Sequence, residues 1–268
     1  MSLPAETTEF PATVPSLAVD LTALGVEPGM VLVVHSSLKS LGWVNGGAVA
    51  VILALEQALG PEGTLVMPTH TGDLSDPANW VAPPVPESWW ETIRATMPAY
   101  DRALTPTFFM GAIPETFRKQ EGVLRSDHPT ATFAARGTHA QQIVEHHELL
   151  PFFGERSPLA RIYDLDGWVL LLGVGHGNNT SLHVAEGRAH IQHRPVPTGS
   201  PLMVDGERQW VAYDDIDWDD SDFVALGADF ARETGLQREG KIAQATALLM
   251  PQRALIDYAV PWLERHRT

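Results

Sequence analysis

The sequence predicts an α/β fold built on a sheet with parallel strands. The β-branched run Met30–Val34 precedes a helical pattern over Gly46–Leu59, and a second apolar run, Thr64–Met67, is stopped by Pro68. Short, continuously apolar runs are typical of strands buried on both faces. Strand, loop, helix and strand in succession imply parallel pairing with a crossover through the helix. A third such run, Trp168–Gly173, leads into a glycine-rich loop.

Further helices are predicted from apolar spacing. Leu17, Leu21 and Leu24 repeat at helical spacing and are followed by Gly25. The other segments expected to be helical are Ile113–Lys119, His139–Leu149, Phe223–Glu233 and Lys241–Arg265, with Pro251 a point where the last could break.

Two regions lack such periodicity. Residues 1–15 contain three prolines, and we expect them to be a loosely ordered lead-in to a single domain over residues 16–268. Residues 71–110 are rich in Pro and Trp. Long loops in compact domains are usually functional or disordered, and the tryptophans favour order. We therefore expect residues 71–110 to form a long excursion over an active site.

Composition narrows the class of partner. The 268 residues include 18 Lys and Arg against 33 Asp and Glu, a formal net charge of −15. Such a charge opposes nucleic-acid binding and favours cationic ligands, although acidity for solubility alone is an equal alternative. The absence of cysteine excludes disulfides and thiolate nucleophiles. With no apolar run long enough for a bilayer and no signal-like start, we expect a cytoplasmic protein with no membrane partner. A homodimer is left open.

Polar loops follow the first two predicted strands. The segment His35–Gly42 offers hydroxyls and backbone amides before a helix N-terminus, which suits the phosphates of a nucleotide-like cofactor. It matches neither a Walker A loop nor a GxGxxG fingerprint, so neither ATP nor NAD is indicated, and a plain turn is the alternative. Thr69, His70 and Asp73 follow the second strand and could point into the same cleft.

The strongest motif is Gly173–Glu186, a glycine-rich turn followed by a helix expected to begin near Ser181. His183 and Glu186 are three residues apart, so they share one helix face. A histidine can act as a general base because its ordinary pKa lies near neutrality. Glu186 could hold its tautomer or bind a cationic substrate. A histidine hydrogen-bonded in the core is the alternative.

Six aspartates lie within nine residues from Asp214 to Asp222. They could supply a carboxylate to His183 or an acidic wall for a polycation, and a solvated acidic loop is the alternative. The segment lacks the glycine and the terminal glutamate of an EF-hand loop. The histidines show no HExxH-like spacing, and His146-His147 is expected on a solvent-facing helical segment. We therefore expect no metal cofactor.

Four segments, in order over roughly residues 16–265, resemble the aminoglycoside 3-N-acetyltransferase family. They are His35-Ser-Ser-Leu…Gly42, Met67-Pro-Thr-His-Thr…Asp73…Asp76-Pro77, Arg125-Ser-Asp-His-Pro129 and Gly173-Val-Gly…Asn179-Thr-Ser-Leu-His-Val-Ala-Glu186. The resemblance implies a central mixed, largely parallel sheet flanked by helices, distinct from the GNAT acetyltransferase fold. It also implies that acetyl passes directly from acetyl-CoA to an amine, without an acyl-enzyme.

The resemblance also implies roles for individual residues. His183 would deprotonate the amine, oriented by an acidic partner for which Asp217 is the first choice, with Asp214 or Asp215 as the others. The residues implied to bind a cationic substrate are Asp73, Glu186 and Asp214. Those implied to contact the cofactor are His35, Ser36, Ser37, Leu38, Gly42, Thr69, Thr107, Met110 and Thr180.

The resemblance leaves the acceptor open. An aminoglycoside modified at its 3-N position is the leading hypothesis, and another small amine is the nearest alternative. A ligand-binding protein of the same fold without activity is a further alternative. The last is a metal-dependent hydrolase that would use His35, His70, His183 and Asp73.

Overall fold

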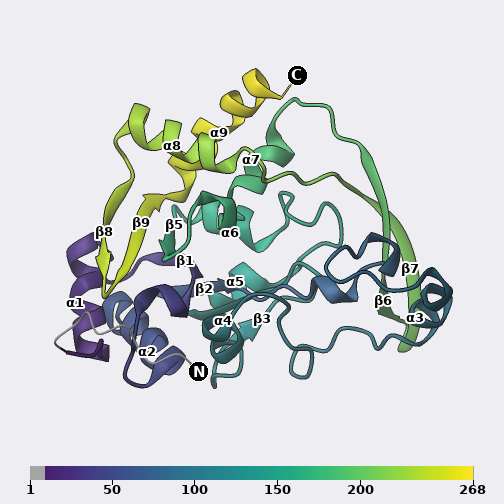
Figure 1. Ribbon diagram of the computed structural model, residues 1–268, viewed down its shortest axis with the longest axis horizontal. Coiled ribbons are helices and arrows are strands. Elements are labelled where there is room, and N and C mark those ends of the chain that lie inside the picture. The colour runs from purple at the N-terminus through teal and green to yellow at the C-terminus, as the bar shows by residue number, and fades with distance from the viewer. Residues whose placement is uncertain (1–9, 268) are drawn as a thin grey trace.

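The computed structural model describes residues 10–267, and Figure 1 shows their arrangement. The helices are α1 Val14–Leu24, α2 Gly47–Leu59, α3 Trp90–Thr96, α4 Ala112–Phe117, α5 Ala140–Val144, α6 Pro158–Asp164, α7 Leu182–Arg188, α8 Phe223–Thr234 and α9 Gln252–His266. The strands are β1 Val31–Ser36, β2 Thr64–Pro68, β3 Leu124–Arg125, β4 Phe133–Gly137, β5 Trp168–Leu172, β6 Pro195–Val204, β7 Glu207–Ile216, β8 Arg238–Ile242 and β9 Ala245–Pro251. Within residues 10–267 no helix is both long and apolar enough to span a bilayer.

A seven-stranded mixed sheet forms the centre, in the order β3-β4-β2-β1-β5-β9-β8. The central strands β2, β1 and β5 are parallel, with Val33 of β1 opposite Val66 of β2 and Val169 of β5. β4 pairs antiparallel with β2, and β9 with β5. The predicted mixed α/β fold is confirmed, with parallel pairing confined to the three central strands.

Helices cover both faces of this sheet, which explains why its central strands carry buried apolar side chains on both faces. Leu32 and Val34 of β1 pack in one buried cluster with residues of α1, α2 and α4. Val31 and Val33 point the other way, into a cluster with residues of α5 to α9. Figure 1 shows α1 and α2 below the sheet and α8 and α9 above it.

The carboxyl ends of the three parallel strands meet at one edge of the sheet. From β1 the chain passes through α2 to β2 on one side, whereas β5 lies on the other, so β1 marks a topological switch point. Gly173, directly after β5, has φ 71°, and a Cβ there would lie 2.5 Å from the Ser40 Cβ. Ser40 Oγ donates a hydrogen bond to the Gly173 carbonyl at 2.9 Å, which ties the loop after β5 to the loop after β1.

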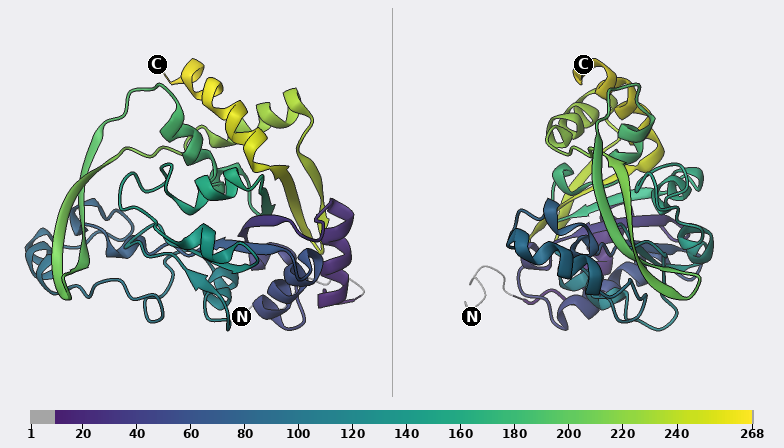
Figure 2. Two further views of the ribbon diagram at one scale, coloured as in Figure 1. Left: turned by 180° about the vertical axis from the view of Figure 1, so that it is seen from behind. Right: turned by 90° about the vertical axis from the view of Figure 1, so that its right-hand side faces the viewer.

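β6 and β7 form a separate two-stranded ribbon that the sequence patterns did not predict. Its turn is Asp205-Gly206, both at positive φ (52° and 83°), as type I′ hairpins require. Figures 1 and 2 show the ribbon at the end of the molecule opposite α1. Arg208 ties it to the end of α3 by donating to the carbonyls of Ala95 (3.0 Å) and Met97 (2.9 Å).

Residues 71–110 fold into α3 and three short 3-10 turns, joined by coil. Arg125 anchors the far part of this excursion, because its guanidinium donates to the carbonyls of Thr105 (2.6 Å) and Thr69 (2.7 Å). The helix α1 begins at Val14 and is capped by Thr13, so regular structure starts before the predicted boundary at residue 16. The rest of the predicted lead-in, residues 1–9, lies outside the described residues.

Two helix predictions are wrong in part. The segment 241–265 begins as the hairpin β8–β9, because the alternating residues of β9 complete the sheet against β5, and α9 starts only after Pro251. In the segment 139–149 the helix ends at Val144, and the chain turns at His146 with φ 50°. His147 is buried rather than solvent-facing, with its ring nitrogens bonded to Ser126 Oγ (3.1 Å) and the Phe152 carbonyl (3.0 Å).

Candidate active site

A cavity of about 210 Å³ lies at the carboxyl ends of β1, β2 and β5. The loop before α7, the end of the 71–110 excursion and the start of α8 complete its walls. Its lining residues are His35, Ser36, Pro68, His70, Phe109, Met110, Pro114, Val174, Gly177, Asn178, Asn179, Thr180, His183, Asp220 and Phe223.

His183 reaches this cavity from the first turn of α7, which begins at Leu182. Its imidazole stacks on Phe153, with centroids 4.9 Å apart and an interplanar angle of 11°. Trp218 and Phe223 contact it from two further directions, at centroid distances of 5.4 and 4.9 Å. Three aromatic neighbours fix the plane of the ring, and only 12 % of the His183 side chain is exposed.

Glu186 holds the inner nitrogen of this histidine. The Oε2 atom of Glu186 lies 2.7 Å from His183 Nδ1, and the Glu186 side chain is fully buried. Its other oxygen, Oε1, accepts from Arg267 Nη1 (2.6 Å) and from the Asp219 backbone N–H (2.9 Å). A carboxylate accepts hydrogen bonds and does not donate them, so the proton of the neutral His183 ring lies on Nδ1. The other nitrogen, Nε2, then carries a lone pair. Within residues 10–267, Nε2 has no hydrogen-bond partner.

The opposite wall of the cavity is polar but lacks internal partners. Among the described residues, neither Ser36 Oγ nor either ring nitrogen of His70 makes a hydrogen bond, although all three atoms are buried. His35 makes one long contact, 3.4 Å from its Nε2 to Thr180 Oγ1. Burial and, second, the charge of nearby histidines together lower the pKa of both His35 and His70 to about 3, although the Thr132 backbone, close to His70 without a hydrogen bond of standard geometry, acts in the opposite direction on His70. Both rings are therefore neutral near pH 7.

The glycine-rich loop between β5 and α7 is held from behind by His176. Its Nε2 lies 2.8 Å from Gln237 Oε1, and its Nδ1 lies 3.4 Å from Asn179 Nδ2. The ring packs directly on α8 at Gly227, where a Cβ would lie 2.1 Å from the His176 Cγ. This loop delivers Asn178, Asn179 and Thr180 to the cavity wall.

The structure brings part of the predicted cofactor set to the cavity. The members that line it are His35, Ser36, Met110 and Thr180. Ser37, Leu38 and Gly42 follow β1 in a 3-10 turn outside the cavity wall. Thr69 is fully buried and bonded to Thr132 and Arg125, whereas the Thr107 N–H donates to Glu115 Oε2 (2.8 Å). Neither threonine lines the cavity, because each is committed to internal contacts.

Asp217 does not contact His183, contrary to our first choice of carboxylate partner. It pairs with Arg194, 2.9 Å from its Oδ2 to Arg194 Nε, and lies near His193. The carboxylate that does contact His183 is Glu186, which the sequence also offered. Asp215, a fallback, is buried and accepts a hydrogen bond from Trp218 Nε1 (2.6 Å), and the Trp218 ring packs on His183, but no hydrogen bond joins Asp215 to His183 among the described residues.

The predicted substrate-binding residues are dispersed. Glu186 faces His183, whereas Asp214 is exposed on β7 and does not line the cavity. Asp73 is half-buried in a 3-10 turn after β2, with one carboxylate oxygen unpartnered among the described residues, and burial raises its pKa. Of the aspartate-rich segment, Asp220 alone lines the cavity.

Sequence reasoning missed the residues that hold Glu186 and frame His183. Arg267 lies 81 positions beyond Glu186, and no local pattern links the two. Phe153 comes from a loop between α5 and α6, and Asp219 contributes only its backbone N–H. The density of aspartates near Asp219 indicated the right segment, but it could not reveal that the contact with Glu186 is made by the Asp219 backbone N–H.

Metal ligation finds no support in the described geometry. Within residues 10–267 no three His, Asp or Glu side chains come together as a metal site requires. His35, His70 and His183 line one cavity, but Asp73 is not among its lining residues.

Taken together, this geometry is chemically suited to proton transfer: a histidine whose Nε2 is open to the cavity, oriented by a buried carboxylate, lies beside unpartnered polar atoms. Comparison with known proteins specifies it further. Residues 33–264 match a family described as aminoglycoside 3-N-acetyltransferase. The chain belongs to the aminoglycoside 3-N-acetyltransferase family and is an acyltransferase of that family.

Individual relatives cover almost the whole chain. The SPbeta prophage-derived aminoglycoside N(3')-acetyltransferase-like protein YokD of Bacillus subtilis is 43% identical over 258 residues, 96% of this chain and 94% of YokD. Its crystal structure superposes with a TM-score of 0.94 and covers 97% of this chain and 96% of that chain, at 42% identity.

Two further relatives were solved with ligands. AAC-IIIb in a binary complex with CoASH is 31% identical, with a TM-score of 0.84 over 96% of this chain and 97% of that chain. AAC-VIa bound to sisomicin is 29% identical, with a TM-score of 0.85 over 97% of this chain and all of that chain.

Proposed function

We propose that this protein transfers an acetyl group from acetyl-CoA to the 3-N amino group of an aminoglycoside, with His183 as general base and Glu186 as the carboxylate that orients it. The observation that carries the proposal is the buried pair of His183 Nδ1 and Glu186 Oε2, 2.7 Å apart, with Nε2 on the cavity side. Family membership and the CoASH complex of AAC-IIIb support the co-substrate. The sisomicin complex of AAC-VIa supports the acceptor class.

The chemistry follows from the state of the histidine. An alkylammonium is not nucleophilic, so His183 Nε2 removes a proton from the acceptor nitrogen. The nitrogen then attacks the thioester carbonyl carbon, the C–N bond forms, the C–S bond breaks, and CoA leaves as a thiol after taking up a proton. Glu186 stabilises the imidazolium that exists between these proton transfers.

The polar wall opposite His183 fits the reacting end of the co-substrate. Acetyl-CoA supplies an activated acetyl group, whose carbonyl oxygen gains negative charge in the transition state and requires donors. Ser36 Oγ, Thr180 Oγ1 and a His70 ring N–H are the groups this chain offers there. A cavity of about 210 Å³ holds the thioester and the acceptor nitrogen, so we expect the remainder of CoA to lie over the loop after β1.

The experiment measures release of free CoA with a thiol reagent, which is clean here because the protein has no cysteine. Wild type is assayed with acetyl-CoA and sisomicin, gentamicin or kanamycin, and in parallel with simple alkylamines. The matched variants are His183→Ala and His190→Ala, the latter removing an exposed histidine. We expect His183→Ala to lose at least about 100-fold in turnover and His190→Ala to keep it.

The outcomes separate the parts of the proposal. Turnover close to wild type in His183→Ala contradicts the general-base mechanism. CoA release with simple amines but with no aminoglycoside moves the acceptor to another amine and leaves the base intact. Tight CoA binding without release for any amine favours the ligand-binding alternative.

A further inference from the structure

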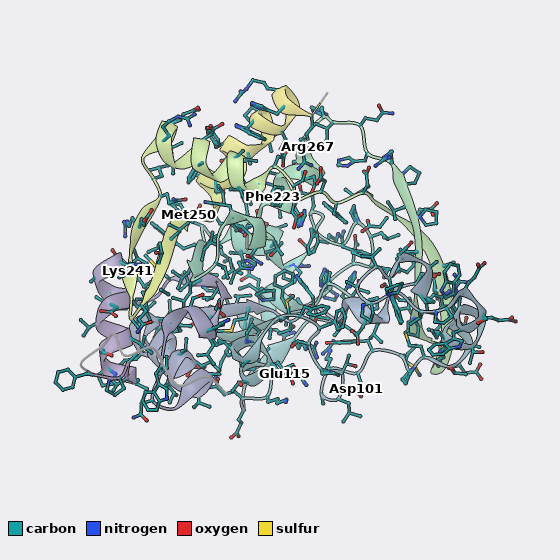
Figure 3. The ribbon with its side chains drawn as sticks, in the orientation of Figure 1. Asp101, Glu115, Phe223, Lys241, Met250 and Arg267 are labelled. Carbon is teal, nitrogen blue, oxygen red and sulfur yellow. The ribbon has the colours of Figure 1, made fainter. Side chains whose placement is uncertain are left out.

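Arg267 contacts Glu186, although proton transfer by the His183–Glu186 pair does not in itself require an arginine. It lies at the C-terminal end of α9, where its backbone N–H donates to the Leu263 carbonyl at 2.8 Å. Figure 3 shows Arg267 above Phe223. From there Nη1 reaches Glu186 Oε1 at 2.6 Å, the oxygen that does not face His183.

The guanidinium is itself fixed by a second carboxylate. Arg267 Nε lies 2.7 Å from Asp222 Oδ2 and Nη2 lies 2.5 Å from Asp222 Oδ1, a bidentate pair. Asp222 occupies the N-cap position of α8 yet makes no side-chain cap, because its carboxylate is committed to Arg267. The guanidinium also lies 5.8 Å from the centre of the Phe223 ring, and Phe223 contacts His183.

We propose that Arg267 is a positioning residue of the catalytic pair: it holds Glu186 Oε1, so that Oε2 stays turned toward His183 Nδ1 and Nε2 faces the cavity as the base. This inference rests on the proposed function, since it assigns the residue that holds the base of that reaction in place. Through this contact the C-terminal end of α9 is joined to the His183–Glu186 pair.

The charges around the pair explain why a cation is needed at this point. A fully buried carboxylate with one neutral imidazole partner is unfavourable unless further donors stabilise it. Arg267 and the Asp219 N–H are the donors on Oε1, and the two neighbouring carboxylates keep Arg267 charged by raising its pKa. The other titratable or charged groups near His183 are Asp215, Asp220, His35 and His70, and those near Glu186 and Arg267 are Asp219, Asp222, His193 and the ion pair of Arg194 with Asp217.

Removing the cation therefore has a predictable sign. With Arg267 gone, Asp215, Asp219 and Asp222 remain as negative charges, and His35 and His70 stay neutral because burial lowers their pKa to about 3. A proton on the His183–Glu186 pair becomes more favourable, so the base is lost to protonation at a higher pH than in wild type. The acidic limb of the activity profile moves to higher pH.

The experiment compares Arg267→Met, Arg267→Lys and the matched control Arg265→Met, which removes an exposed arginine of the same helix. Misplacing a reacting group by about 1 Å can cost about 100-fold. We expect Arg267→Met to lose about 10- to 100-fold in kcat with KM for acetyl-CoA changed less than about twofold, and Arg267→Lys to recover part of kcat. Arg267→Met with the kcat and pH profile of Arg265→Met overturns the proposal.

A second readout needs no acceptor and so separates this inference from the proposed function. The imidazole of His183 is titrated by NMR in the free protein, its signal assigned by its loss in His183→Ala. We expect its midpoint to move to higher pH by about half a unit or more in Arg267→Met and not in Arg265→Met. If Arg267→Met does not fold, Arg267→Gln takes its place, because the amide can still donate a hydrogen bond to Glu186 but carries no positive charge, so the same shift to higher pH is expected. An unmoved midpoint in the folded variant overturns the proposal even where acetyl transfer is observed, and a moved midpoint upholds it even if no acceptor is found.

Discussion

The two walls of the cavity differ in how their polar atoms are satisfied. On the α7 side, both oxygens of Glu186 have partners, and the Nδ1 atom of His183 is one of them. On the side formed by the ends of β1 and β2, Ser36 Oγ and both nitrogens of His70 are buried without a partner in residues 10–267. On the first wall the Glu186 carboxylate is fully partnered without a ligand and His183 Nε2 is left open as the proposed base, whereas the second wall lacks hydrogen-bond partners that a ligand can supply.

This difference separates positioning from binding. A buried polar atom left without a partner costs about 1–3 kcal/mol, so a protein retains several together only where they are used. A base, by contrast, must be held before its substrate arrives, because reorganisation during the reaction raises the barrier. Changes on the α7 wall should therefore reduce turnover with little effect on ligand binding, whereas changes on the β1–β2 wall should reduce the binding of acetyl-CoA as well as turnover.

The largest expected effect is on turnover in Glu186→Gln. The amide keeps the shape of the side chain but removes the negative charge that stabilises the imidazolium, and it leaves Arg267 with one carboxylate fewer. We expect kcat to fall by about 100-fold or more, with KM for acetyl-CoA nearly unchanged. Steady-state CoA release measures both constants.

The matched control is Glu155→Gln, which removes the same charge from a largely exposed side chain paired with Arg188. It should leave both constants near wild type. An equal loss of kcat in the two variants would mean that net charge, and not the contact with His183, governs turnover.

The next effect is on co-substrate affinity in His70→Leu. This substitution removes two unpartnered nitrogens from the β1–β2 wall, so we expect the free energy of unfolding at pH 7.5 to be unchanged or slightly higher. The affinity for acetyl-CoA should fall by about tenfold, as expected when a hydrogen-bond donor to its carbonyl oxygen is lost, whereas the affinity for free CoA, which has no such oxygen, should change less. Isothermal calorimetry measures the affinity and urea unfolding the stability.

His147→Leu supplies the contrast in stability. His147 is also buried, but its two ring nitrogens bond to Ser126 and Phe152. Its replacement leaves those partners unsatisfied, and we expect a loss of about 1–3 kcal/mol. If His70→Leu destabilises the protein as much as His147→Leu, the nitrogens of His70 have hydrogen-bond partners in the folded protein, and the β1–β2 wall is not the unpartnered one.

Local patterns sufficed for the parts of the fold that depend on local chemistry. The runs around β1, β2 and β5 are almost continuously apolar because helices cover both faces of the sheet, so these strands could be recognised without knowing their partners. The pairing of His183 with Glu186 could also be predicted, because side chains three positions apart lie on the same face of a helix.

What could not be predicted depends on contacts distant in sequence. The family resemblance implied an acidic partner for His183, and within the aspartate-rich segment Asp217 was the first choice, but Asp217 lies just after β7 and pairs with Arg194. The ribbon could have been predicted from Asp205-Gly206, a dipeptide typical of type I′ turns. No sequence pattern indicates the contact of Arg267 with Glu186, because the two residues are 81 positions apart.

The smallest effect is the pH dependence of stability, and it tests whether the β1–β2 wall is desolvated as described. Burial lowers the pKa of His70 to about 3, whereas in the unfolded chain it returns to about 6.5. Between these values the unfolded state binds a proton that the native state does not, so stability falls as the pH falls below about 6.5. At pH 5.5 this histidine alone lowers the free energy of unfolding by about 1.4 kcal/mol relative to pH 7.5.

Urea unfolding at pH 5.5 and 7.5 measures this difference in the free energy of unfolding, which should be smaller by about 1.4 kcal/mol in His70→Leu than in wild type. An exposed-site control, His190→Leu, should keep the wild-type difference. If His70→Leu keeps it too, His70 already takes up its proton in the folded protein, and the wall is open to water.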